Sequence, residues 1–400
     1  MAEALTGVFD DWTRPVAAGQ PLRFGPTGFR FACLELVDTD REAEVVCPRA
    51  ESIVRRVERR ATFRSGDGRL DAVWEVGART IELCLQDHVW DGVKRGRSVW
   101  AGDLYPAAAV VATLFGEHPV VLASLDHLRD QVFDGETVHG WMNGIPAYTL
   151  WWVLTQRDWF RAHGNRGYLE EQRAFLLALL PALSAGVGPD GRECLEDGWR
   201  FLDWASENDP DAVQAGYQGL FKLGLAAAAE LCRELGEQAA ATGYRDAAGR
   251  LVGWEPPARS KQAWALMSLA GLVAPDRARE VLASAPGEGL TPFLGFVVLE
   301  ALSALGAVDA GLELVRRYWG GMIDLGATTF WEDFDLSWAP GATGIDRPVP
   351  DGGKGIHEWF RRCSAFGLAQ SLCHGWSAGP TAWLSREVGG QPGCSRESRS

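Results

Sequence analysis

The chain has 400 residues, of which 46% are apolar, and a formal net charge of −14 at pH 7. This length suits one large helical domain or two smaller domains, and the apolar content is sufficient for a sizeable core. The acidic balance argues against a nucleic-acid partner and against binding to anionic membranes, because both need clustered Lys and Arg.

Tryptophan and cysteine are the informative residue types. The 18 Trp against 6 Tyr, many of them close in sequence to Asp, Glu, Gly or His, favour an aromatic-lined cavity for a small-molecule substrate. The 8 Cys are scattered, with no His at metal spacing, so we expect no disulfide framework, no metal and no cofactor. The N-terminal residues lack the pattern of a signal peptide, and no apolar run reaches membrane length. We therefore expect a cytoplasmic protein with reduced thiols.

Residues 1–65 differ in pattern from the rest of the chain. The stretches GPTGFRFACLEL (residues 25–36) and EVVC (residues 44–47) are short β-type runs bounded by Gly, Pro and Asp. They predict a small β-rich N-terminal segment. Residues 66–386 predict one helical domain, and we expect residues 387–400 to form a disordered tail.

The helical region begins with apolar residues at a period near 3.6 over residues 70–85. Similar stripes recur at residues 103–115, 118–133, 147–162, 166–186, 210–235, 258–272, 292–306, 308–319 and 360–373. Short turns connect them, which predicts helical hairpins in a ring or a bundle; periodicity leaves that choice open. The Pro- and Gly-rich residues 340–355 predict an irregular loop that acts as a lid.

The loop of residues 90–103, WDGVKRGRSVWAGD, combines Asp91 and Asp103 with several cations, among them Arg95. A surface salt-bridge network is the ordinary explanation for such a loop. The flanking tryptophans, such as Trp100, favour a functional site instead, because exposed tryptophans beside charges are uncommon on plain surfaces.

Residues 326–335, GATTFWEDFD, place Glu332 directly after Trp331. Partial desolvation beside the indole would raise the pKa of this carboxyl and suit it to general acid or base chemistry. Acidic residues near the positive end of a helix dipole would explain the same pattern. The sequence leaves these two interpretations open.

Residues 371–380, SLCHGWSAGP, contain His374 and Trp376 among small residues. This pattern predicts a helix end that faces a cavity. A structural histidine near a helix C-terminus fits it equally well.

Residues 199–204, WRFLDW, place Asp203 beside Trp204. Asp203 either accepts a hydrogen bond from a ligand or is a buried acid paired with an Arg, and the residues do not separate the two. A weaker fifth cluster of candidates comprises His139, Trp141, Asn143, Tyr148, Trp151 and Trp152. His88 and His357 are candidate proton carriers, each more readily explained as structural.

Taken in order, these four segments resemble the motifs of the α-L-rhamnosidase-type six-hairpin glycosidases. The 90–103 loop is similar to the family's acid loop, residues 199–204 to its W-x-F-x-D-W segment, and residues 329–332, TFWE, to its T-x-W-E base motif. Residues 373–380, CHGWSAGP, match a motif near the last barrel helix. The resemblance implies a mainly α protein, an (α/α)6 barrel behind a small β-rich N-terminal segment.

The resemblance also implies roles for individual residues. Glu332 matches the general base of an inverting hydrolase, and Asp91 matches a carboxylate that contacts the substrate. The general acid of the family falls on Gly96, which has no side chain. Candidate substrate-binding residues are Arg95, Trp100, Asp103, Trp141, Tyr148, Trp152, Asp203, Trp204, Trp331, His357 and Trp376.

Three hypotheses follow from Gly96, because loss of a general acid costs about 10²–10⁴-fold in rate. In the leading one, the barrel performs elimination, conjugate addition or cyclisation on a bulky hydroxylated natural product, with Glu332 as base and Asp91 and His374 as further proton carriers. In the alternative, it remains an inverting hydrolase whose acid is displaced to Asp91, Asp87 or Asp103. In the third, it is a non-catalytic binder of a sugar or metabolite.

Overall fold

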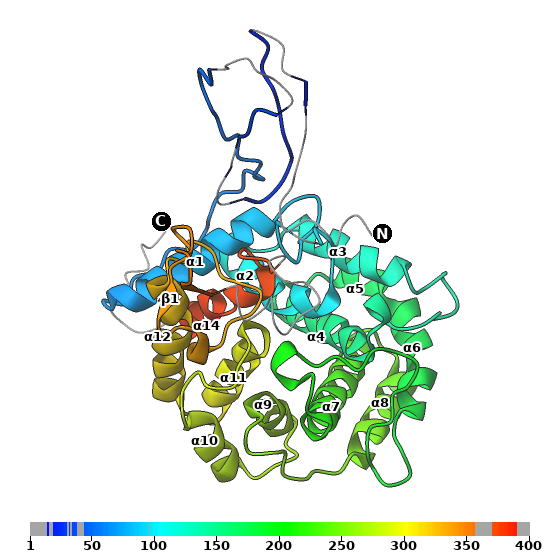
Figure 1. Ribbon diagram of the computed structural model, residues 1–400. Coiled ribbons are helices and arrows are strands. Elements are labelled where there is room, and N and C mark those ends of the chain that lie inside the picture. Colours follow the sequence, from blue (N-terminus) through cyan, green and yellow to red (C-terminus); the bar gives the residue numbers. More distant parts are fainter. Residues whose placement is uncertain are drawn as a thin grey trace, which may run out of the picture.

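The computed structural model describes residues 14–15, 19–29, 32, 34–37, 44–94, 96–356 and 370–389. Helices dominate it and form a closed ring (Figure 1). The inner helices each pack against the next, and the last one packs against the first. They are α2 (Ala101–Phe115), α4 (Pro146–His163), α7 (Pro210–Glu234), α9 (Lys261–Leu269), α11 (Pro292–Ala304) and α14 (Pro380–Glu387).

An outer set of helices covers this ring and pairs with the inner helices as hairpins. The outer helices are α1 (Gly68–Cys84), α3 (Pro119–Asp130), α5 (Arg166–Glu171), α6 (Arg173–Ala185), α8 (Gln238–Arg250), α10 (Pro275–Ala283) and α12 (Val308–Asp324). The arrangement is the (α/α)6 barrel that the motifs implied.

The composition of each helix follows its place in the barrel. The inner α11, PFLGFVVLEALSA, is apolar nearly all round, because it packs against neighbours on every side. The outer α12, VDAGLELVRRYWGGMID, buries one face and exposes the other. Where α7 and α9 cross, a Cβ on Gly219 would lie 2.5 Å from the carbonyl carbon of Leu266, so only glycine permits this close approach.

Several helices differ from the expected stripes. The stripe at 166–186 is two helices, α5 and α6, and α8 and α10 were not expected at all. The buried face of α8 is mostly alanine, and α10 is a short helix that buries only three residues, so neither gives a long apolar stripe. The expected helix at 360–373 lies mostly outside the described residues, and its last residues, 370–373, are not helical.

Short elements connect the helices. The 3₁₀ turns are η1 (Met142–Gly144), η2 (Trp204–Ser206), η3 (Leu336–Trp338) and η5 (Gly375–Ala378). The predicted lid loop contains two short strands, β1 (Ala342–Thr343) and β2 (Lys354–Gly355), which pair in parallel. No helix in the described part of the chain is long and apolar enough to cross a membrane.

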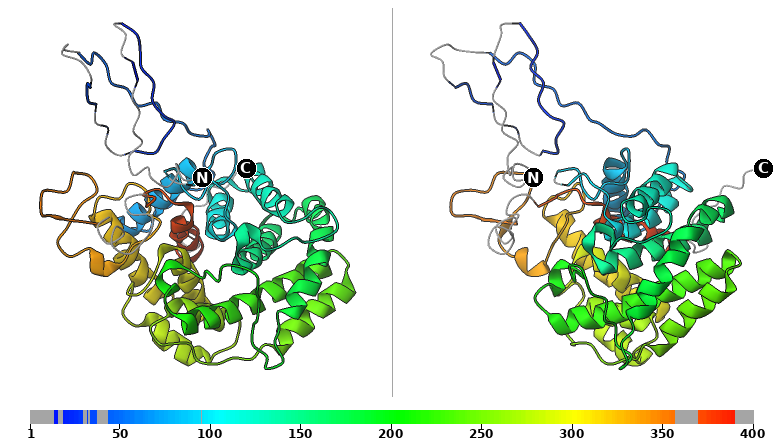
Figure 2. Two further views of the ribbon diagram at one scale, coloured as in Figure 1. Left: turned by 45° about the vertical axis from the view of Figure 1, so that its right-hand side comes forward. Right: turned by 90° about the vertical axis from the view of Figure 1, so that its right-hand side faces the viewer.

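The described residues of the N-terminal segment do not show the β-rich character that we predicted. The described residues among 1–65 contain no strand, and those before about residue 55 project away from the barrel (Figure 2). Apolar side chains such as Val46 and Ile53 are 85% and 65% exposed. Alternating apolar residues form a sheet only when another strand pairs with them, and the described chain supplies none here. Of the predicted tail, only residues 387–389 are described.

Candidate active site

Three segments that are far apart in the sequence meet through backbone hydrogen bonds. Gly375 N donates to Asp91 O at 2.6 Å, His374 N donates to Phe330 O at 2.9 Å, and Glu332 N donates to Ser371 O at 2.9 Å. The 90–103 loop, the TFWE motif and the CHGWSAGP motif are thereby joined into one structure. The backbone places their side chains next to each other, as the resemblance implied.

Gly92 shows how tightly these segments pack. It forms an isolated antiparallel bridge with His374. A Cβ on Gly92 would lie 2.4 Å from Ser371 Oγ and 2.9 Å from His374 Nδ1. A side chain at this position would therefore separate the 90–103 loop from His374.

Asp103 and His374 form a buried ion pair at the start of α2. His374 Nε2 and Asp103 Oδ1 lie 2.8 Å apart. Burial raises the pKa of Asp103, although the hydrogen bond from His374 opposes this. Burial alone would lower the pKa of His374, but the bond to Asp103 and the nearby charges of Glu332 and Asp91 raise it overall. The imidazole ring is held 4.6 Å from the Trp376 ring, measured between centroids.

Glu332 is fully buried and lies in the loop between α12 and η3, not at the N-terminus of an α-helix. The helix-dipole interpretation of its motif is therefore wrong. Its Oε2 accepts a hydrogen bond from Ser371 N at 3.0 Å. Its backbone carbonyl accepts one from Trp376 Nε1 at 2.8 Å, and Trp376 stacks on Phe293 with ring centroids 5.0 Å apart. These contacts hold the carboxylate in one orientation.

Asp91 is also buried, with 5% of its surface exposed, so it and Asp103 are not part of a surface salt-bridge network. Asp91 Oδ1 accepts a hydrogen bond from Ser98 N at 3.0 Å. Burial raises the pKa of Asp91 to about 6, and the charge of Asp103 acts in the same direction, while His374 opposes it.

Gly96 lies directly against the Asp91 carboxylate. Its φ is +47°, and a Cβ built on it would lie 2.2 Å from Asp91 Oδ2. The Asp91 carboxylate therefore occupies the space that a side chain at position 96 would need.

Aromatic rings line one side of the site. Trp100 meets Tyr148 edge to face at 6.0 Å, Tyr148 meets Phe201 at 6.2 Å, and Phe201 meets Trp204 at 4.8 Å, all between centroids. Burial, together with the charges of Asp103, Asp91 and Glu332, raises the pKa of Tyr148 well above its ordinary value. The Tyr148 hydroxyl therefore lies within electrostatic range of all three carboxylates.

Several predicted substrate-binding residues have structural partners instead. Trp152 is fully buried and donates from Nε1 to Leu125 O at 2.9 Å, which is a structural contact, and its assignment to a substrate pocket stays a prediction. Asp203 is fully buried and caps η2, with Oδ2 accepting from Thr291 Oγ1 at 2.8 Å. No Arg pairs with Asp203 among the described residues, and the neighbouring Arg200 binds Glu193 instead.

The remaining candidates differ in how far they are buried. Trp141 is half-buried and donates from Nε1 to Glu196 O at 2.7 Å. Trp331 is buried and packs edge to face on Phe334. His139 is exposed and pairs with Asp134 at the surface. Arg95 and His357 lie outside the described residues.

Two contacts of the site were not expected from the sequence. Ser371, to which we gave no role, positions Glu332 through its backbone N–H, and a backbone contact leaves no mark on residue type. Asn143 has φ of +54°, accepts from Ala101 N at 3.0 Å and donates to Val99 O at 3.1 Å, which joins the end of the 90–103 loop to η1. The Asn143-Gly144 dipeptide is a turn signal that marks this position.

Comparison with known proteins agrees with this geometry. Residues 58–253 match the family model of the bacterial alpha-L-rhamnosidase six-hairpin glycosidase domain. A rhamnosidase from Klebsiella oxytoca, solved with rhamnose bound, is 25% identical with a TM-score of 0.65, over 83% of this chain and 66% of that one. Residues 58–253 belong to the α-L-rhamnosidase-type six-hairpin glycosidase domain family, whose fold the whole barrel shares.

Two further structures share the fold of this rhamnosidase-type chain. The GH78 family rhamnosidase of Bacillus sp. GL1 is 24% identical with a TM-score of 0.64, over 82% of this chain and 36% of that one. The Streptomyces avermitilis alpha-L-rhamnosidase complexed with L-rhamnose is 19% identical with a TM-score of 0.58, over 80% and 32%. The rhamnosidase-type chain thus spans about a third of these two proteins. Comparison with curated proteins finds no match.

Proposed function

We propose that the chain hydrolyses α-L-rhamnosides or closely related glycosides with inversion, using Asp91 as general acid and Glu332 as general base. The proposal rests on one observation: the Asp91 carboxylate lies against Gly96, the position that corresponds to the family's general acid. This is the alternative that we set out from the sequence, and it replaces elimination or cyclisation as the leading hypothesis. No feature of the described residues favours those non-hydrolytic reactions over hydrolysis.

Asp91 has the properties that a general acid needs. A general acid must hold a proton before the reaction and release it to the leaving oxygen, so its pKa should lie near the working pH. The pKa of Asp91, about 6, meets this condition, whereas an ordinary exposed Asp would be ionised. Burial supplies the shift, as it does for other catalytic carboxylic acids.

In the proposed reaction, Glu332 removes a proton from water, and the water oxygen attacks the anomeric carbon. Asp91 protonates the glycosidic oxygen as its bond to that carbon breaks, which releases the leaving group. The Asp103–His374 pair, rigid and buried, supplies hydrogen-bonding groups for the sugar hydroxyls. The bound rhamnose named for the Klebsiella oxytoca structure supports this substrate class.

The first test is release of 4-nitrophenol from 4-nitrophenyl α-L-rhamnoside, with NMR to follow which anomer forms first. We expect the β-anomer first, and Glu332→Gln should lower kcat by about 10²–10⁴-fold. Asp130→Asn, on the exposed end of α3, is the matched control. Absence of any release by the unmodified protein would overturn the proposal and leave the non-hydrolytic and binder hypotheses.

A second test isolates Asp91. A nitrophenolate leaves readily without a proton, whereas an alkoxide does not, so Asp91→Asn should slow an alkyl rhamnoside far more than the 4-nitrophenyl one. Equal losses on both substrates would show that Asp91 is not the acid.

A further inference from the structure

Two buried cysteines meet beside the candidate active site. Cys84 is the last residue of α1 and has no exposed surface, and Cys373 directly precedes His374 and is 6% exposed. The two residues come from opposite ends of the helical domain. Both thiols are free in the structure, and none of the roles assigned so far uses them.

Each sulfur lies against the segment that carries the other. Cys373 Sγ is 3.8 Å from Thr80 O, which is the carbonyl that faces Cys84 N across the last turn of α1. Cys84 Sγ is 4.0 Å from Asp91 O, which also accepts from Gly375 N, two residues after Cys373. The two thiol groups are themselves in hydrogen-bonding contact. The backbone therefore brings the two sulfur atoms together.

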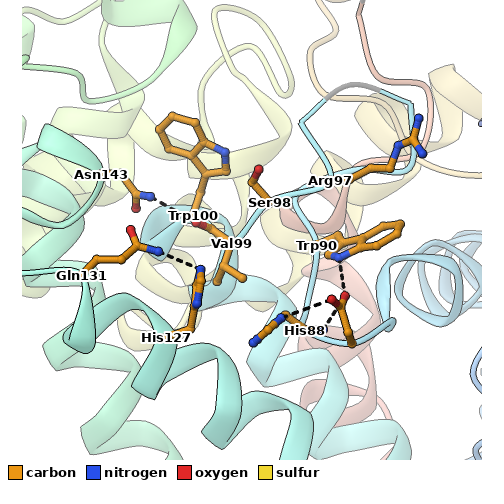
Figure 3. Close-up of a pocket in the computed structure, with 10 residues that line it drawn as sticks. His88, Trp90, Arg97, Ser98, Val99, Trp100, His127, Gln131 and Asn143 are labelled. Atoms are coloured by element: carbon orange, nitrogen blue, oxygen red, sulfur yellow. Dashed lines mark hydrogen bonds and ion pairs between the residues drawn. The ribbon is translucent and has the colours of Figure 1, made fainter. Parts of the chain in front are cut away.

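Backbone hydrogen bonds hold both cysteines in this position. Trp90 N donates to Cys84 O at 2.9 Å, and Val93 N donates to Cys373 O at 3.3 Å. Figure 3 shows the Trp90 indole bonded in turn to Asp87, with Nε1 donating to Oδ1 at 2.8 Å. A disulfide has an S–S length of about 2.05 Å, so the sulfurs need only a short movement from contact to form one.

Burial determines how this pair reacts. The hydrogen bond with Cys373 and burial both raise the pKa of the Cys84 thiol well above its ordinary value. The thiolate is the nucleophile in disulfide exchange, so a raised pKa slows the reaction. An oxidant also reaches the pair only when the structure opens locally. Cys373 keeps some exposure and Cys84 has none, so Cys373 is the thiol that meets the oxidant first.

We propose that Cys84 and Cys373 form a disulfide when they are oxidised by a small disulfide of the glutathione class. The Cys373 thiolate attacks one sulfur of the oxidant and displaces half of it as a thiol. Cys84 then attacks the Cys373 sulfur of this mixed disulfide and displaces the other half. One S–S bond forms and one breaks, two electrons pass to the oxidant, and its two halves leave with the two thiol protons.

The disulfide joins the end of α1 to the CHGWSAGP motif. A cross-link between residues far apart in sequence restricts the unfolded chain more than one that closes a short loop. Oxidation should therefore raise the unfolding temperature of the chain. The proposal does not depend on the hydrolytic function, because the proposed reaction uses neither thiol.

The test incubates the full chain with oxidised glutathione, below its unfolding temperature, until the count of free thiols is constant. Digestion without reduction, followed by mass spectrometry, should then recover the Cys84 and Cys373 peptides linked, with two hydrogen atoms lost. The oxidised chain should unfold several degrees above the reduced chain. Separate recovery of the two peptides would overturn the proposal, as would a link from either one to a different cysteine.

Variants show whether this pair causes the rise. Cys84→Ala and Cys373→Ala each remove one sulfur and should show no rise on oxidation. The oxidised and reduced forms are compared within each variant, so any loss of stability from the substitution itself cancels. Cys232→Ala, at a fully buried cysteine on α7, is the matched control and should keep the full rise. A rise that persists in Cys84→Ala or Cys373→Ala would assign it to other cysteines and overturn the proposal.

Discussion

The Asp91 carboxylate fills the space that a side chain at Gly96 would need. A Cβ on Gly96 would lie 2.2 Å from Asp91 Oδ2, and Gly96 has φ of +47°. The glycine that removes the family's acid is therefore the residue that allows a different carboxylate to fill its place. The pair acts as a unit, and restoring an acid at position 96 does not rebuild the family's site.

Gly96→Glu should therefore lower both activity and stability instead of raising activity. The new side chain would displace Asp91. A residue with a Cβ in the left-handed backbone conformation of position 96 also costs about 1 kcal/mol. Thermal unfolding and 4-nitrophenol release measure the two effects. Gly164→Glu, with φ of +66° and no neighbour within 4 Å of its Cβ, is the matched control and should lose only the backbone contribution. Higher activity in Gly96→Glu would contradict our assignment of Asp91.

The pH profile should report Asp91. Its carboxyl must be protonated to act as the acid, so kcat/KM for an alkyl rhamnoside should fall above about pH 6, by about tenfold per pH unit. In Asp91→Asn this limb should disappear along with most of the activity. An unmodified profile that stays flat from pH 6 to 8 would exclude Asp91 as the acid.

Stability should change with pH in the same direction. The pKa of Asp91 is raised in the folded state from 3.8 to about 6, so the folded chain holds this proton more tightly than the unfolded chain. The resulting stabilisation is complete below about pH 4 and is lost as the pH rises through 6. The difference in unfolding temperature between the unmodified chain and Asp91→Asn should therefore depend on pH across this interval, and a constant difference would argue against the shift.

Asp103→Asn should lower the pKa of His374, because the hydrogen bond that His374 donates to the Asp103 carboxylate opposes the effect of burial. NMR titration of the imidazole measures this pKa directly. Asp134→Asn is the matched control, since it removes the partner of the exposed His139 and should leave His374 unaltered. An unchanged His374 pKa in Asp103→Asn would show that the ion pair does not set its charge.

Trp152 and Trp100 should respond differently to replacement. Trp152→Ala removes a fully buried indole from the core and should cost about 3–5 kcal/mol of folding stability. Trp100→Ala removes a half-buried ring at the site and should raise KM with a smaller loss of stability. Denaturant unfolding and Michaelis–Menten kinetics measure the two quantities. If Trp152→Ala kept its stability and raised KM, the original assignment of Trp152 to the pocket would be right.

The amino-acid sequence determined the helical class of this protein and the four segments that form its site. Apolar periodicity predicts helices because a helix that packs against a core needs one apolar face. The CHGWSAGP and TFWE motifs indicate the site because few other structures need these residue types in this order. Helix α8 was missed because its buried face is mostly alanine, and α10 was missed because it is short and buries only three residues. The β-type runs before residue 55 form no strand in the described chain, because strand formation needs a partner that periodicity does not reveal.

Only the tertiary structure decided which side chains are available for chemistry. Trp152 and Asp203 are fully buried, and their burial depends on helices and loops distant in sequence. The placement of Asp91 against Gly96 depends on a positive φ at Gly96 and on the 90–103 loop folding back on itself. A pKa follows from burial and from neighbouring charges, and both are properties of the packed molecule. The sequence thus showed that an acid is absent from position 96, and the folded chain supplies the carboxyl that takes its place.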